Sequence, residues 1–171
     1  MATIDLSEAS DRVSCHLVGQ MFRRNPNLLL ALQASRTRRI SQKLTSMLPP
    51  ELELNKFSTM GSACTFPVES LTFLAIAIAS VLTHRKQYVT AKTVESLMGE
   101  LAVFGDDIVI PADSRLLFTE ALEVLDFKVN TNKSFWIGGF RESCGVDAYE
   151  GVDVTPVYWR QLCDGKPASI A

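Results

Sequence analysis

In Leu101-Ala-Val-Phe-Gly-Asp-Asp-Ile-Val-Ile-Pro111, two adjacent carboxylates lie on a glycine turn between two short apolar runs. Glycine accepts a positive φ and aspartate tolerates one, so Gly105-Asp106-Asp107 predicts a tight turn. The β-branched and aromatic residues on both sides are typical of strands and predict a β-hairpin. Hard divalent cations such as Mg²⁺ bind carboxylate oxygens together with substrate phosphates. The alternative is an acidic surface loop without function, because short motifs often match by chance.

The composition indicates one globular domain without a strong overall charge. The 171 residues are 47% hydrophobic, which is enough for a packed core. A formal net charge of −2 argues against an overall basic surface for nucleic acid, so any such surface must be local. The four cysteines are scattered without a Cys-x-x-Cys pair, which argues against zinc and for free thiols in a reducing cytoplasm. The apolar run 71–82 is about a dozen residues long, short for a membrane crossing, and predicts a buried helix and no membrane partner.

The hydrophobic pattern predicts an α+β fold. The order is strand, helix, hairpin, helix and strand, the β-α-β-β-α-β, ferredoxin-like arrangement of an antiparallel sheet backed by helices. In this topology the first strand lies beside the hairpin, so Asp5 at its end approaches Asp106 and Asp107 at one edge of the sheet. The predicted ranges are a strand over 2–6, helices over 7–22 and 67–83, a helix over 114–126 capped by Ser114, and strands over 127–130, 134–141 and 152–155.

Two segments between the first strand and the long helix carry weaker signals. Residues 28–47 begin as a helical pattern and end in a basic cluster, which fits either a solvated helix face or a local phosphate-binding patch. A strand is predicted over 51–54. Residues 56–66 are rich in small side chains and lead into a helix, and such a loop can receive phosphate or a sugar hydroxyl. The members of the basic cluster are Arg36, Arg38, Arg39 and Lys43.

Several stretches follow one another in the sequence: Asp5-Leu-Ser-Glu-Ala-Ser-Asp11, Ser58-Thr-Met-Gly-Ser-Ala-Cys-Thr-Phe66, Phe104-Gly-Asp-Asp107, and Phe140-Arg-Glu-Ser-Cys-Gly145 with Gly151-Val-Asp-Val-Thr-Pro156. In this order they resemble a known family. The family is the RNA-directed RNA polymerases of single-stranded RNA bacteriophages, the leviviruses, and the similarity is to their palm, over residues 3–160. Each motif alone is weak, and their common order and spacing make them specific.

The resemblance implies a catalytic centre with two metal ions. Asp5 and Asp106 would hold two Mg²⁺ ions, with Asp107 assisting and Mn²⁺ able to substitute. Such ions activate the primer 3′-hydroxyl and stabilise the pyrophosphate leaving group. Lys133 resembles the lysine of the fourth polymerase motif, a proton donor to pyrophosphate.

The resemblance also implies a set of nucleotide- and RNA-binding residues. An aspartate at the end of the first motif would sense the ribose, the second motif would contact the incoming nucleotide or template, and the fifth would support the primer. The acid at position 69 stands where many viral RNA polymerases carry asparagine, although the phage enzymes tend to carry an acid there. These residues are Asp11, Ser58, Gly61, Thr65, Glu69 and Arg141.

The implied function is template-directed ribonucleotidyl transfer in the replication of a phage RNA genome. Its partners would be an RNA template, nascent RNA, ribonucleoside triphosphates and recruited host translation proteins, in the cytoplasm of an infected bacterium. Residues 1–160 would form the palm and 161–171 would begin the following segment. Fingers and a thumb are not recognised in the sequence, so we expect a replicase fragment that is inactive alone. The alternatives are a non-catalytic palm remnant and another palm-fold nucleotidyl transferase such as a reverse transcriptase.

Overall fold

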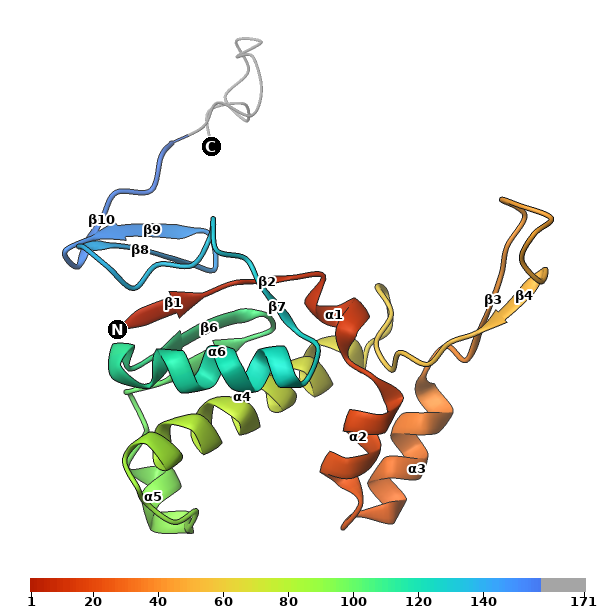
Figure 1. Cartoon of the computed structure of the whole chain (residues 1–171), viewed down its shortest axis with the longest axis horizontal. Helices are drawn as coiled ribbons and strands as arrows, with labels where there is room; N and C mark the ends of the chain where they lie inside the picture. The colour runs from red at the N-terminus through yellow and green to blue at the C-terminus, as the bar shows by residue number, and fades with distance from the viewer. Residues whose placement is uncertain (158–171) are drawn as a thin grey trace, which may run out of the picture.

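The computed structural model describes residues 1–157 (Figure 1). The expected α+β class is confirmed, because helices and antiparallel strands share the chain. In chain order the elements are β1 (Ala2–Ile4), β2 (Leu6–Ser7), α1 (Ala9–Arg12), α2 (Cys15–Phe22), α3 (Pro26–Ser35), β3 (Arg39–Ser41), β4 (Glu51–Glu53), α4 (Thr65–His84), α5 (Ala91–Glu95), β5 (Ala102–Phe104), β6 (Asp107–Ile110), η1 (Ala112–Ser114), α6 (Arg115–Val124), β7 (Lys128–Val129), β8 (Phe140–Ser143), β9 (Val146–Tyr149) and β10 (Val152–Asp153).

The central sheet has the order β1-β6-β5 and is antiparallel throughout. β5 and β6 form the hairpin predicted from the two apolar runs, with Phe104 paired to Asp107. β1 pairs with β6 in a register that sets Ile4 opposite Ile108. Beyond Asp5 the chain continues as β2, which pairs with β7. The first strand therefore lies beside the hairpin, as expected.

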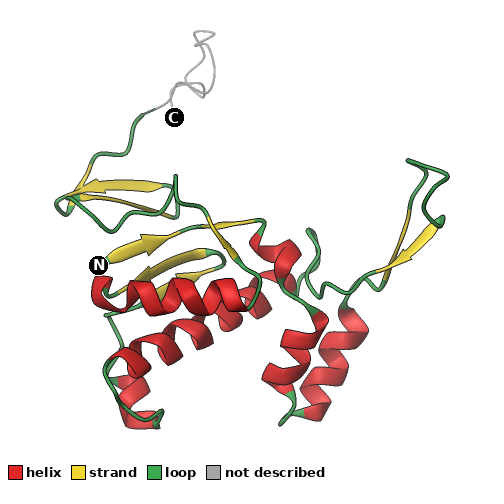
Figure 2. Ribbon diagram, in the orientation of Figure 1, coloured by secondary structure: helices red, strands yellow, loops and turns green. Residues whose placement is uncertain are grey.

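Helices α4 and α6 lie side by side under one face of this sheet (Figures 1 and 2). They bury apolar side chains against the strands, which is the main source of stability in such a layered fold. The rings of Phe73 and Phe127 meet edge to face at 4.9 Å within this core. Pro67 stands in the first turn of α4, where its missing N–H would have no helical partner in any case.

Helix α4 is longer than the apolar run suggested. It spans 20 residues, and an apolar window of 18 residues within it has a mean hydropathy of 1.8, so by length and composition it would pass for a membrane-spanning helix. Half of that apolar window is buried inside the protein, however, which is also what the core helix of a globular domain shows. The prediction of a buried helix therefore agrees with the packing of α4.

The prediction of one helix over 7–22 is wrong, because the chain is extended at Val13 between α1 and α2. Backbone hydrogen bonds to a distant segment hold this break: the Phe57 N–H donates to the Val13 carbonyl at 2.7 Å, and the Cys15 N–H donates to that of Asn55 at 2.8 Å. Ser14 then caps α2, since its Oγ accepts the N–H of Leu17 at 3.1 Å. A local 3.6-residue pattern does not contain this long-range pairing.

The basic cluster is not on a helix face. Helix α3 ends at Ser35, and Arg39 and Lys43 lie on an arm formed by β3, β4 and the loop between them, residues 39–53. This arm projects away from the sheet and helices (Figure 1). Arg39 and Lys43 are exposed, whereas the half-buried Arg36 donates to the carbonyls of Thr37 and Leu54, and Arg38 donates to that of Gln33. A role of the cluster in phosphate binding stays a prediction.

The C-terminal half departs from the prediction in three details. Ser114 does not cap α6 through its side chain; its hydroxyl donates to Asp113 Oδ1 at 2.8 Å. The strand expected over 134–141 is reduced to a single bridge at Phe135 followed by β8, because a glycine turn with Gly138 at φ +70° interrupts it. Strand β9, which was not predicted, joins β8 and β10 in a small antiparallel sheet next to β1 (Figure 2). Residues 158–171, including the predicted following segment 161–171, lie outside the described residues.

Candidate functional site

Asp5 lies between β1 and β2, where a turn far along the chain holds both its backbone and its side chain. The Asp5 N–H donates to Ser134 Oγ at 3.1 Å, and the Asn130 N–H donates to the Asp5 carbonyl oxygen at 2.9 Å. Asn130 Nδ2 also donates to Asp5 Oδ2 at 2.8 Å. The same turn contains Lys133, whose N–H donates to the Asn130 carbonyl at 3.1 Å. These contacts fix the direction of one carboxylate at the end of β1.

The Gly105–Asp107 turn brings two more carboxylates to this end of the sheet. Gly105 has φ +64°, the left-handed conformation expected of a glycine in a tight turn. Because Ile4 pairs with Ile108, the antiparallel register continued by one residue sets Asp5 opposite Asp107. Directly opposed like charges on neighbouring strands repel one another, so folding alone gives no reason for this arrangement.

The electrostatics of the carboxylates show that they act on one another. Burial raises the pKa of Asp5, the hydrogen bond from Asn130 opposes that rise, Asp106 and Asp107 raise it further, and Lys133 lowers it. Burial and the charge of Asp106 raise the pKa of Glu69 to about 7 from its ordinary 4.5. Glu69 is only 6% exposed. Perturbed carboxylates gathered around one turn are typical of functional sites.

The donor chemistry of this cluster suits a hard cation, although the protein alone does not complete a cage. Within residues 1–157, no three Asp, Glu, His or Cys side chains are grouped so that they could hold a metal ion. Mg²⁺ commonly binds through one or two carboxylates and takes its remaining ligands from water and substrate phosphates. The Asp5 carboxylate, with Asp107 opposite it and Asp106 next to Asp107 in the turn, fits that limited requirement.

Comparison with known sequences agrees with the sequence resemblance. Residues 1–170 match the family model described as RNA replicase, beta-chain. The chain belongs to the RNA replicase beta-chain family. It is 37% identical over 164 residues to the RNA-directed RNA polymerase subunit beta of Qbeta virus (strain MX1), covering 94% of this chain and 25% of that protein. It is 38% identical over 158 residues to the RNA-directed RNA polymerase beta chain of Enterobacteria phage fr, covering 92% and 26%. For the beta chain of Escherichia phage MS2 the identity is 36% over 164 residues, covering 96% and 27%. This replicase-family chain spans about a quarter of the length of the curated relatives it matches.

In this replicase-family chain, the second motif forms a closed loop before α4. Thr65 Oγ1 donates to the Thr59 carbonyl at 2.7 Å and accepts the Thr59 N–H at 3.2 Å, which joins the two ends of the loop. Gly61 is exposed at the loop tip with φ +88°. Ser58 is fully buried, and its hydroxyl has no hydrogen-bond partner among the described residues. Contact between Ser58 and a nucleotide would therefore require the loop to move, whereas Gly61 is accessible as it stands.

Two other predicted binding residues lie apart from the carboxylate cluster. Asp11 forms an ion pair with Lys56, with 2.5 Å between Oδ1 and Nζ, in a polar pocket of about 380 Å³ that Arg12 also lines. Arg141 donates from Nε to the carbonyl of Met1 at 2.6 Å, which is the opposite end of β1 from Asp5. Arg141 thus ties β8 to the start of the central sheet, and its predicted role in RNA binding has no direct counterpart among these contacts.

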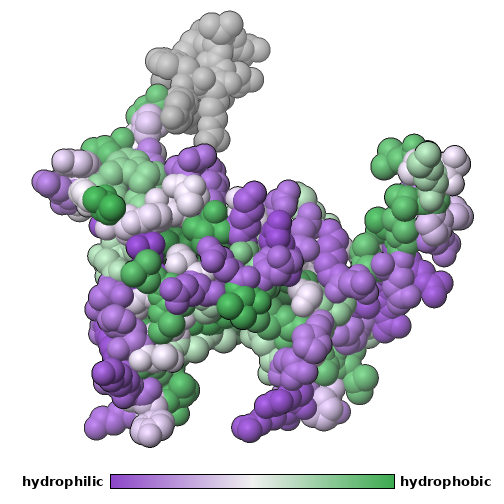
Figure 3. All heavy atoms as spheres, in the orientation of Figure 1, coloured by the Kyte–Doolittle hydropathy of each residue, from purple (hydrophilic) through white to green (hydrophobic). Residues whose placement is uncertain are grey.

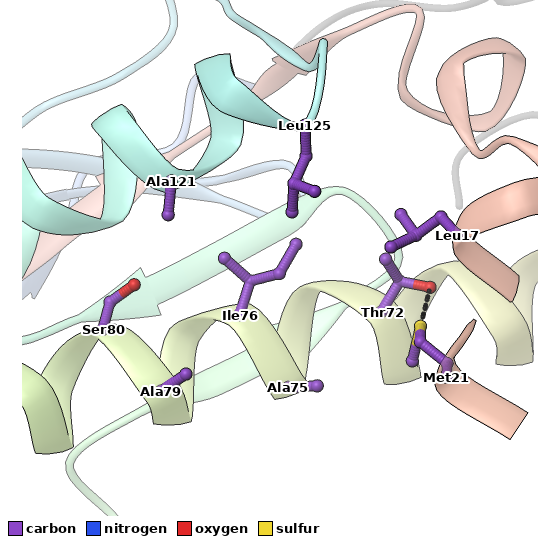
Figure 4. Close-up of a pocket in the computed structure, with 9 residues that line it drawn as sticks. All are labelled: Leu17, Met21, Thr72, Ala75, Ile76, Ala79, Ser80, Ala121 and Leu125. Carbon is purple, nitrogen blue, oxygen red and sulfur yellow. Dashed lines mark hydrogen bonds between the residues drawn. The ribbon is translucent and has the colours of Figure 1, made fainter. Parts of the chain in front are cut away.

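An apolar cavity of about 290 Å³ lies between α2, α4 and α6, on the helical layer (Figure 4). Thr72 Oγ1 lies 3.3 Å from Met21 Sδ across its wall. None of the side chains that line it is ionisable, so it offers no acid, base or metal ligand. They are Leu17, Met21, Thr72, Ala75, Ile76, Ala79, Ser80, Ala121 and Leu125.

Sequence reasoning missed the residues that orient the cluster. Asn130 and Ser134 hold Asp5, and Ser70 on α4 accepts the N–H of Gly105 at 2.9 Å. The polar run that starts at Asn130 directly after a strand is turn chemistry and was a usable signal. A serine inside an apolar helix gives no comparable signal, because its partner lies 35 residues away.

Proposed function

We propose that this chain is the palm segment of a levivirus RNA-directed RNA polymerase and that Asp5 and Asp106 hold the two Mg²⁺ ions of its catalytic centre, with Asp107 assisting. One observation carries the proposal. In a chain of the replicase family, the carboxylate at the end of β1 lies opposite an Asp-Asp turn on the neighbouring hairpin, and Asp106 and Asp107 both raise its pKa.

The strand order supports the assignment to a ferredoxin-like palm. β1 and β2 follow one another through Asp5 and together occupy one position in the strand order. On one side β2 pairs with β7, and on the other β1 pairs with β6, which pairs with β5; all three pairings are antiparallel. Helix α4 connects the first strand region to the hairpin, and α6 connects the hairpin to β7. This is the sequence order β-α-β-β-α-β, with both helices under one face.

In this proposal, individual residues have the following roles. Asn130 keeps Asp5 Oδ2 directed, and the turn presents Asp106 and Asp107 from the facing strand. Bound Mg²⁺ would supply Lewis-acid activation of the primer 3′-hydroxyl and charge stabilisation of the leaving pyrophosphate. Lys133 lies in the turn that holds Asp5, where an ammonium can donate a proton to that leaving group.

The nucleotide-binding roles have unequal support. With a pKa of about 7, Glu69 is partly protonated at neutral pH, and in that form it can donate a hydrogen bond to a sugar hydroxyl close to Asp106. The exposed Gly61 and the loop closed by Thr65 lie at the N-terminus of α4, which favours phosphate or sugar oxygens. For Ser58 and Asp11, and for Arg141 in primer support, the proposal rests on the family resemblance.

The partners and setting follow from the same proposal. The relatives are named RNA-directed RNA polymerases, so we propose an RNA template, nascent RNA and ribonucleoside triphosphates as the molecules this chain meets. Recruitment of host translation proteins and action in the cytoplasm of an infected bacterium are further predictions from the resemblance.

The proposal is tested in a chimera that carries this chain in place of the matching quarter of a relative's polymerase subunit. We expect Mg²⁺-dependent RNA synthesis that prefers ribonucleotides over deoxyribonucleotides, and no synthesis from the 171-residue chain alone. Asp106→Asn should reduce synthesis at least about 100-fold without unfolding the chain, since changes to residues that only support metal ligands already cost about 10–100-fold. Glu95→Gln, at an exposed acid in α5 outside the motifs quoted above, is the control. Near-normal synthesis by the Asp106→Asn chimera would refute the metal assignment.

A further inference from the structure

The first two turns of α4 contact the Gly105–Asp107 turn directly. Ser70 Oγ accepts the N–H of Gly105 at 2.9 Å, which joins the helix to the peptide that leads into Asp106. Gly105 is buried, so this N–H is shielded from water. A buried backbone N–H without an acceptor destabilises the folded state, and the Ser70 hydroxyl supplies the acceptor.

Phe66, one helical turn before Ser70, lies against the same peptide. Its ring meets the ring of Phe104 edge to face, with 4.8 Å between centroids. A Cβ built on Gly105 would lie 2.8 Å from Phe66 Cε2. Gly105 therefore packs so closely against the Phe66 ring that a Cβ atom at this position would clash with it.

Phe66, Glu69 and Ser70 are spaced i, i+3 and i+4, so they occupy one face of α4. The hydrogen bond from Gly105 to Ser70 and the contact of Phe66 with Gly105 place that face beneath the turn, and the buried Glu69 lies on it. Two side chains of one helix face, Ser70 and Phe66, thus contact the backbone of Gly105 and the ring of Phe104.

We propose that Ser70 is a positioning residue: by accepting the Gly105 N–H it fixes the peptide before Asp106 and so sets the direction in which the Asp106 carboxylate meets a metal ion. This inference rests on the proposed function, which makes Asp106 a metal ligand. Ser70 itself touches neither metal nor substrate in this scheme. Loss of its hydroxyl frees the turn to rotate, and metal affinity should fall while the fold is retained.

The test uses the 171-residue chain and NMR. Amide hydrogen exchange at Gly105 reports the hydrogen bond, and line broadening by Mn²⁺ reports metal binding at Asp5 and Asp106. Ser70→Ala should speed Gly105 exchange at least about 10-fold and weaken Mn²⁺ binding about 10-fold. Ser70→Thr keeps the hydroxyl and should restore both values to near wild type. Ser96→Ala removes an exposed hydroxyl from the end of α5 and should change neither.

The outcomes distinguish a failure of this inference from a failure of the proposed function on which it rests. If the wild-type chain shows no Mn²⁺ broadening at Asp5 and Asp106, the proposed metal site fails and the inference fails with it. If wild type binds Mn²⁺ and Ser70→Ala binds it equally well, the metal site stands and Ser70 is merely structural. Unchanged Gly105 exchange in Ser70→Ala would also overturn the inference.

Discussion

The Gly105–Asp107 turn and the arm at residues 39–53 are both hairpin tips, but they are held in opposite ways. The turn is flanked by the buried Ile108 and is fixed from outside its own hairpin, by β1 and by Ser70 of α4. The arm depends on itself: the Gln42 side chain donates to the carbonyls of Thr45, Leu48 and Pro49 and accepts the N–H groups of Leu44 and Thr45.

The surfaces of the two tips differ as well. Leu44 and Met47 at the arm tip are 95% and 93% exposed, and they form an apolar end on a projecting segment (Figure 3). The turn instead presents carboxylates above an apolar layer. A tip fixed by long-range contacts can hold charged groups in costly proximity, whereas a tip fixed by one local side chain keeps its shape without help from the core.

The largest difference should appear when a leucine is truncated in each region. Leu122 is fully buried on α6 beneath the sheet, so Leu122→Ala should lower the free energy of unfolding by about 2–5 kcal/mol. Leu44→Ala at the arm tip should change it by less than about 0.5 kcal/mol. Urea unfolding measures both, and a comparable loss from Leu44→Ala would show that the arm packs on the core.

A smaller effect should follow from pH at Glu69, beneath the turn. Because its pKa is raised from 4.5 to about 7, the folded state binds a proton that the unfolded state has lost, and stability should fall as the pH rises through that window. We expect a loss on the order of 1–3 kcal/mol between about pH 5 and pH 8. Asp5, whose pKa is also raised, adds to the slope at the acidic end.

Glu69→Gln should remove most of that slope, and Glu95→Gln on an exposed turn of α5 should leave it unchanged. Urea unfolding at several pH values across the same window gives the comparison. An equal slope in Glu69→Gln and wild type would mean that Glu69 is solvated and not part of the cluster.

The smallest effect is the difference in unfolding free energy between alanine substitutions at two glycines that both have a left-handed backbone conformation. Gly99 has φ +83°, and a Cβ added to it would meet open space, so Gly99→Ala should cost only the backbone strain, about 1–2 kcal/mol. Gly105→Ala must in addition push the Phe66 ring from Phe104, which adds about 1 kcal/mol. Urea unfolding again gives the two free energies, and equal values for the two variants would show that Phe66 moves aside without cost.

The features that the sequence predicted correctly are those written in local patterns. Two apolar runs around Gly105 were enough for the hairpin, and the apolar periodicity was enough for α4 and α6. The approach of Asp5 to the turn followed from topology. The break at Val13 depends on the backbone of residues 55–57, and the support of Asp5 depends on Asn130 and Ser134, so neither is visible in a local pattern.

The hydrogen bonds that orient Asp5 determine when the site can form while the chain is being synthesised. Asp5 is made well before the residues that orient it, because its side chain and backbone bind partners 125 and 129 positions later. Its strand, β1, pairs with β6, whose residues are also made much later. A nascent chain released up to α4 therefore carries the acid without its orientation, and the site is completed only when the turn at Asn130 emerges. Loop closures of this length slow folding, so the carboxylate cluster should be among the last parts of the domain to form.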